Sequence, residues 1–199
     1  MPGQALKRFA ERRPAIERCD LCSAELSSDH EHLVEPATSE LHCVCRACAI
    51  LFGHQSSRKY RRVPRRIEQL TGFRLTDAEW TGLGIPIGMA FFVASGEAKR
   101  VIAIYPSPGG PIESLLRFDS WDDLVAKNPV LNEFEPDVEA LLVNRIGEDR
   151  LYFRAPIDEC YKLVGLVRQH WRGFSGGGDV WNHIGEFFAS LNDRSDRQR

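Results

Sequence analysis

The residues best suited to chemistry are cysteines, and five of the six lie between positions 19 and 48. They form two groups, Cys19-Asp20-Leu21-Cys22 and Cys43-Val44-Cys45-Arg46-Ala47-Cys48. Two cysteines separated by two residues can bring both sulfurs onto one ion, and two such pairs complete a tetrahedral shell of four thiolates. The spacing therefore predicts a metal site whose ligands are Cys19, Cys22, Cys45 and Cys48.

The residues between the two pairs fit a zinc ribbon. Leu33-Val34 and the run 41–44 have the pattern of a short hairpin, with a turn at Pro36-Ala37-Thr38-Ser39. We therefore expect a small zinc-ribbon-like, or rubredoxin-like, cysteine knuckle at the N-terminus.

Cys43 leaves the ligand set open. Residues two apart on a strand share a face, so either Cys43 or Cys45 can supply the third thiolate. The favoured interpretation makes Cys43 a small buried side chain beside the site. His30, His32 and His42 are spare ligands, but with four thiolates present we expect them to be surface polar residues.

Zinc is the predicted ion, and iron is the alternative. A four-cysteine shell suits either metal, because thiolates alone do not select between them. A rubredoxin knuckle has glycine directly after its second cysteine, whereas this chain has Ser23 and Ala49 there. This departure favours zinc.

Composition narrows the class of protein. The chain of 199 residues is 43% hydrophobic and 27% charged, which is typical of a globular protein. We expect a cytoplasmic protein with no membrane insertion, since no apolar run approaches the length of a span and the N-terminus is charged. A net charge of −2 argues against a dedicated nucleic-acid binder.

The rest of the chain predicts an α+β domain, a mixed, mainly antiparallel sheet with C-terminal helices. Strands are expected at 88–93, 100–105, 113–118, 139–144 and 150–154. Short helices are expected to begin at the capping patterns of Thr76 and Ser120. Two final helices follow Pro156 and Asp179, and a short basic helix is expected at 3–13.

These patterns divide the chain into a metal-knuckle segment at 1–57, a basic linker at 58–72 and the α+β domain at 73–199. The run 58–66 holds six cations in nine residues, which could bind phosphate or an acidic partner. The favoured interpretation is a solvated linker, because Pro64 interrupts any helical stripe.

No catalytic constellation emerges, and we expect a protein that is not an enzyme. Cys160 lies on an apolar helical face, where a thiol acts as a small inert side chain. Ser107 lies in a Pro-flanked loop that matches a nucleophile elbow only loosely.

Several motifs together resemble an uncharacterised bacterial family. They are CDLC at 19–22, HCVCRACAILF at 42–52, GIPIGMAFF at 84–92, YPSPGG at 105–110, EPDVEALLVNR at 135–145 and WRGFSGG at 171–177. Members are typically encoded beside high-affinity nickel–iron uptake hydrogenases. The resemblance implies a protein partner, a hydrogenase subunit or maturation factor, and it supplies no catalytic residue.

Three functions follow as hypotheses. The first is a non-enzymatic accessory protein that acts through protein contacts. The second is a rubredoxin-like iron protein that transfers electrons, and the third is a zinc-ribbon protein that binds nucleic acid through the basic run. The sequence does not set the oligomeric state.

Overall fold

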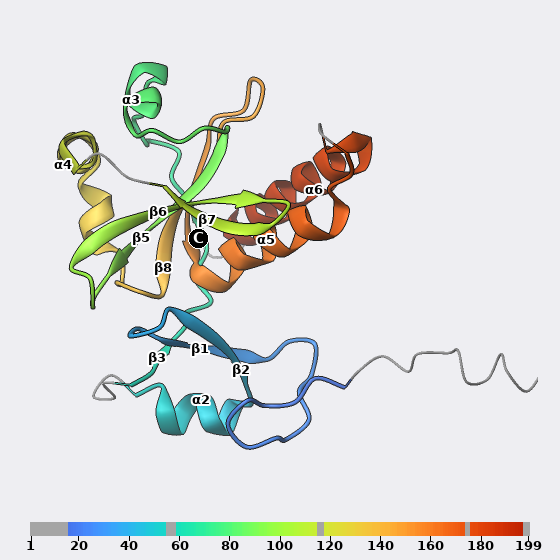
Figure 1. Ribbon diagram of the computed structural model, residues 1–199. Helices are drawn as coiled ribbons and strands as arrows, with labels where there is room; N and C mark the ends of the chain where they lie inside the picture. The colour runs from blue at the N-terminus through green and yellow to red at the C-terminus, as the bar shows by residue number, and fades with distance from the viewer. Residues whose placement is uncertain (1–15, 55–58, 115–117, 174–175, 197–199) are drawn as a thin grey trace, which may run out of the picture.

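Runs of apolar residues separated by turns give this chain two antiparallel sheets, a small one near the N-terminus and a larger one after it (Figure 1). The computed structural model describes residues 16–54, 59–114, 118–173 and 176–196. The expected helix at 3–13 lies outside these residues.

The small sheet has the strand order β2-β1-β3. Strands β1 (Glu31–Glu35) and β2 (Glu40–Val44) form a hairpin, and helix α2 (Arg46–Phe52) follows directly. This arrangement confirms the hairpin predicted between the two cysteine pairs. Leu33 and Val44 are fully buried and form its small core together with Cys19, Cys48 and Ala49.

The larger sheet has the order β4-β9-β8-β5-β6-β7, and every pairing among the described residues is antiparallel. Its elements and the helices that flank them are β4 (Glu68–Gln69), α3 (Asp77–Gly82), β5 (Met89–Ser95), β6 (Arg100–Ser107), β7 (Gly110–Ser114), α4 (Phe118–Lys127), the 3-10 helix η1 (Pro129–Glu133), β8 (Glu139–Asn144), β9 (Leu151–Pro156), α5 (Ile157–His170) and α6 (Gly177–Asp196). The α+β class is confirmed.

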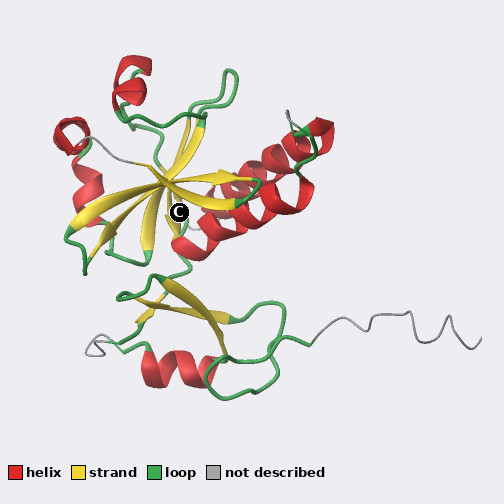
Figure 2. Ribbon diagram, viewed as in Figure 1, coloured by secondary structure: helices red, strands yellow, loops and turns green. Residues whose placement is uncertain are grey.

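Helices cover both faces of this sheet (Figure 2). Phe91 and Leu142 face α5 and α6, whereas Phe92 and Leu141 face α3 and α4. Because alternate side chains of a strand point to opposite faces, burial of both faces requires a continuous apolar run. Strand β8 is accordingly buried along its whole length.

The helix starts follow local capping chemistry. The capping box that the sequence predicts at Thr76 is present, with Thr76 and Glu79 each accepting a backbone N–H of the other. Helix α5 begins after Pro156, and its predicted apolar face is buried. Helix α4 begins at Phe118, two residues before the predicted cap.

The predicted strand at 113–118 is wrong in position. Strand β6 continues to Ser107, and β7 starts at Gly110, after a two-residue turn. The Ser107 hydroxyl donates to the Gly110 carbonyl and accepts from the Gly109 amide. These bonds stabilise a tight turn at 108–109, so the next strand begins before the predicted residue 113. The expected loop at 105–110 is therefore mostly strand.

The expected solvated linker is wrong for the described part of 58–72. Strand β3 (Arg61–Arg62) pairs with β1, and β4 pairs with β9, so this segment belongs to both sheets. Its arginines are paired as well, Arg62 with Glu31 at 3.0 Å and Arg65 with Asp29 at 2.9 Å. Domain boundaries at 57 and 72 stay a prediction.

The two sheets are packed together through a shared core. Val34 of β1 and the buried Val63 belong to the cluster that contains Ile157 and Cys160 of α5. The small sheet therefore lies against the end of α5 (Figure 1).

Among the described residues, no helix has both the length and the apolar content of a membrane span.

Candidate metal centre

The first cysteine pair lies in a tight loop that begins and ends in a short antiparallel bridge between Arg18 and Glu25. The Cys19 amide donates to the Ala24 carbonyl at 2.8 Å, and the Ser23 amide donates to the Cys19 carbonyl at 2.8 Å. These bonds turn the chain back on itself. The loop thus presents the two sulfurs on the same side.

The second pair lies at the start of a helix, where the sequence predicted another tight turn. Cys45 is the N-cap of α2, and its sulfur accepts from the Cys48 amide at 3.5 Å. Residues three apart share a side of a helix, so the first helical turn brings Cys45 and Cys48 together. The strand β2 leads directly into this cap.

The four sulfurs converge on one point. All lie within 4.8 Å of one another, and those of Cys22 and Cys45 are 3.7 Å apart. Zn–S bonds of about 2.3 Å in a tetrahedron place the sulfurs about 3.8 Å apart. All the cysteines are free thiols. The structure therefore brings together the residues expected as ligands, close enough to share one ion.

The thiols of this cluster differ in acidity. Burial raises the pKa of Cys19, but hydrogen bonds from the backbone of Cys45, Leu21 and Cys22 outweigh it and lower that pKa to about 6. Burial and the neighbouring thiols raise the pKa of Cys48. A thiolate therefore forms readily at Cys19, whereas Cys48 needs a nearby cation to ionise.

Ser23 takes the backbone conformation that glycine usually supplies after the second cysteine of a knuckle. Its φ is 60°, in the left-handed region that L-residues other than glycine seldom adopt. The absence of glycine at this position therefore does not prevent the knuckle from forming. It leaves a strained serine in the loop.

Cys43 does not join the four-sulfur cluster. It lies in a second group with His30 and His32, whose ligand atoms are within 4.8 Å of one another. Burial and the charges of Asp20, Glu17 and Asp158 raise its pKa. The expectation that His30, His32 and His42 are surface residues is wrong, because each side chain is largely buried.

This second group had a detectable signal in the sequence. His30 and His32 are two residues apart, and on β1 His32 is the direct partner of Cys43 on β2. Once the register of the hairpin is known, the two histidines at strand spacing lie opposite a cysteine, and this pattern predicts a cluster of metal-binding side chains. A third group, Glu35, Glu40 and His42, lies at the other end of the hairpin.

Cys160 lies apart from these groups, within α5. It has no exposed surface, and burial raises the pKa of its thiol well above the usual range. A thiol in this environment stays protonated and is a poor nucleophile or metal ligand. This placement agrees with the apolar face predicted for the helix.

The chain belongs to a family of unknown function (DUF5947), whose model matches residues 18–195. The match spans both sheets and all four clustered cysteines. Comparison with curated proteins and with solved structures found no match.

The strain at Ser23 yields a prediction for Ser23→Gly. A left-handed L-residue costs roughly 1–2 kcal/mol, of which glycine recovers part while making the unfolded chain more flexible. We expect Ser23→Gly to stabilise the metal-loaded protein by about 0.5–1 kcal/mol in urea unfolding. The matched control is Ser28→Gly, an exposed serine nearby without positive φ, which should be neutral or destabilising. A destabilised Ser23→Gly would contradict the assigned conformation.

Proposed function

We propose that this protein holds a structural zinc ion in its four-cysteine cluster and acts as a non-enzymatic accessory protein of a nickel–iron hydrogenase system. The observation that carries the metal part is the convergence of four free sulfurs within 4.8 Å of one another. Cys19 and Cys48 are buried, so this shell leaves little room for a substrate. Four protein ligands are characteristic of structural zinc sites, whereas catalytic sites keep an open position.

Zinc is proposed over iron because a closed shell of four cysteines is typical of structural zinc sites. One pair of ligands comes from a loop and the other from the N-cap and first turn of α2. The iron alternative is supported by the exposed Cys22, which brings the ion near the surface, where electron exchange is possible.

Metal content tests this part of the proposal. After dialysis against metal-free buffer, we expect one zinc per chain and no visible absorption. Cys22→Ser and Cys45→Ser should lose that ion, because each removes one of four ligands. Cys160→Ser is the control and should keep it, since Cys160 lies apart in α5. If the protein instead contains iron and absorbs visible light, the electron-transfer alternative is favoured. If either ligand variant keeps a full complement of metal, the substituted cysteine is not a ligand.

The accessory role rests on exposed apolar surface beside the metal cluster. Ile50, Leu51 and Phe52 are consecutive in α2 and are 58%, 71% and 43% exposed. Cys48 anchors the same helix from its buried side. Large apolar side chains that are grouped on a surface favour a protein contact. The choice of a hydrogenase subunit or maturation factor as partner is supported by the sequence resemblance.

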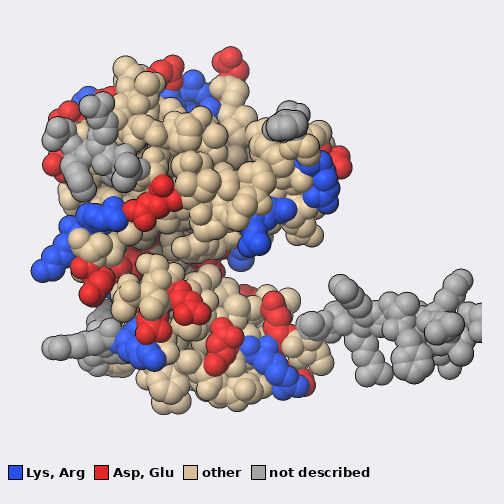
Figure 3. All heavy atoms as spheres, viewed as in Figure 1, with Lys and Arg blue, Asp and Glu red and all other residues tan. Residues whose placement is uncertain are grey.

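Nucleic acid is a less favoured partner than protein. The described arginines of the basic run pair with carboxylates, for example Arg61 with Asp137 and Arg66 with Glu68. In Figure 3 acidic and basic side chains are interspersed over the visible face. Phosphate binding needs cations that are free to replace counterions.

The free thiols fit the reducing cytoplasm that we propose as the location.

Capture from cells that produce the hydrogenase tests the partner. Wild-type protein should retain an identified hydrogenase subunit or maturation factor, and Leu51→Asp should lose it, because a charge in an apolar contact is costly. Ile112→Asp is the matched control and should keep the partner, since Ile112 is an exposed apolar residue of β7. Undiminished capture by Leu51→Asp would exclude α2 as the contact. If wild-type protein retains no hydrogenase-related protein, the proposed partner is wrong.

A further inference from the structure

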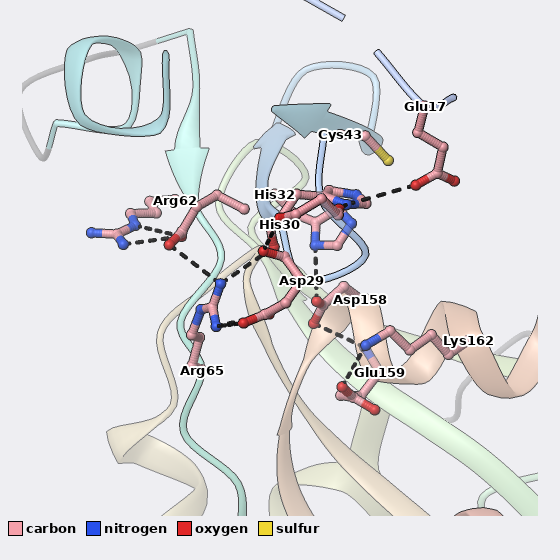
Figure 4. Close-up of polar contacts among 12 residues, drawn as sticks. Glu17, Asp29, His30, His32, Cys43, Arg62, Arg65, Asp158, Glu159 and Lys162 are labelled. Atoms are coloured by element: carbon pink, nitrogen blue, oxygen red, sulfur yellow. Dashed lines mark hydrogen bonds and ion pairs between the residues drawn. The ribbon is translucent and has the colours of Figure 1, made fainter. Parts of the chain in front are cut away.

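A second cluster of metal-binding side chains lies where the small sheet meets helix α5. Figure 4 shows the rings of His30 and His32 side by side, with Cys43 on one side and Asp158 on the other. The ligand atoms of the three residues lie within 4.8 Å of one another. The cluster opens into a cavity of about 700 Å³ between the two parts of the molecule.

Hydrogen bonds orient both histidines as ligands. His30 Nδ1 lies 2.9 Å from the Ser27 carbonyl, and His32 Nδ1 lies 3.0 Å from a carboxylate oxygen of Asp158. Each partner is an acceptor, so Nδ1 carries the proton and donates it. The lone pair is then on Nε2, which is the arrangement that metal-ligating histidines adopt when a carboxylate or carbonyl holds the other nitrogen.

The Nε2 atom of His30 is an independent sign that this cluster binds an ion. The His30 side chain is only 10% exposed, and Nε2 is buried without a hydrogen-bond partner among the described residues. A buried polar atom without a partner costs about 1–3 kcal/mol. An ion bound to this lone pair would satisfy it.

Cys43 supplies the third ligand from a fixed position. Its amide donates to the Asp20 carboxylate at 2.7 Å, and its carbonyl accepts from the Asp20 amide at 2.9 Å. Its neighbours Asp20, Glu17 and Asp158 place negative charge around the thiol. Such surroundings favour a bound cation, whose charge offsets the carboxylates and stabilises a thiolate.

We propose that His30, His32 and Cys43 form a second site, which binds a divalent transition-metal ion through two imidazoles and one thiolate. Tetrahedral bonds of about 2.0 Å to nitrogen and 2.3 Å to sulfur need ligand atoms about 3.3–3.7 Å apart, so the cluster contracts modestly on binding. Asp158 positions His32 and does not touch the ion. Imidazole and thiolate donors select ions of the zinc, cobalt and nickel type over magnesium or calcium.

This site differs in kind from the four-cysteine cluster. Three protein ligands leave a fourth position, which faces the cavity and is open to water or an exogenous ligand. An ion held this way exchanges more easily than one enclosed by four thiolates. Because His32 is bonded to Asp158 on α5, the ion also links the small sheet to the larger part of the molecule.

Cobalt binding tests this proposal on the full-length protein with zinc in its four-cysteine site. In equilibrium dialysis with Co²⁺, we expect one cobalt per chain, near-ultraviolet thiolate-to-cobalt absorption and no loss of zinc. His30→Gln and Cys43→Ser should each lose the cobalt, and Cys43→Ser should lose the absorption. Asp158→Asn should weaken cobalt binding by about 10- to 100-fold, as positioning partners of ligands do. His183→Gln on α6 is the control and should bind as wild type.

Zinc content separates this test from that of the four-cysteine site, because the second-site variants should keep their zinc and their circular dichroism. The proposal is overturned if the wild type binds no cobalt beyond its zinc. It is equally overturned if His30→Gln and Cys43→Ser retain the cobalt. Loss in His42→Gln alone would assign the ion to the cluster of Glu35, Glu40 and His42.

Discussion

The convergence of four cysteine sulfurs on one point is the constraint on which we propose that the small sheet depends. Its own core consists of few residues, chiefly Leu33, Val44 and Ala49 together with two of the cysteines. A unit of this size buries too little apolar surface to be stable alone, and small units of this kind usually need a metal or disulfides. A cation among the four sulfurs would stabilise their ionised form. We therefore expect metal binding at this cluster to be coupled to folding of the small sheet.

What the sequence predicted well are features fixed by neighbours along the chain. The spacing of Cys19 and Cys22 sets a loop, and the capping box at Thr76 sets a helix start, because each involves residues a few positions apart. Strands β5 and β8 were predictable because burial on both faces leaves a continuous apolar run. The sequence argument for zinc over iron relied on finding serine where a rubredoxin knuckle has glycine. Ser23 nevertheless adopts the left-handed backbone conformation typical of glycine, so residue type alone did not reveal the loop geometry.

Features that depend on pairing between distant segments were missed. The run 58–72 was predicted to be a solvated linker because Pro64 interrupts any helical stripe, yet Arg62 and Arg65 pair with Glu31 and Asp29. The grouping of His30 and His32 with Cys43 requires the register of the hairpin. Its carboxylate partner, Asp158, comes from a helix more than a hundred positions away. No local pattern carries that information.

Asp20 connects the two proposed metal sites, since it lies between Cys19 and Cys22 and binds the backbone of Cys43. We propose that an ion bound by the four cysteines organises the small sheet, and amide hydrogen exchange before and after chelation tests this most directly. With the metal removed, amides of β1, β2 and α2 should lose protection while those of β5 and β8 keep theirs. Unchanged protection of β1, β2 and α2 in metal-free protein would contradict the claim.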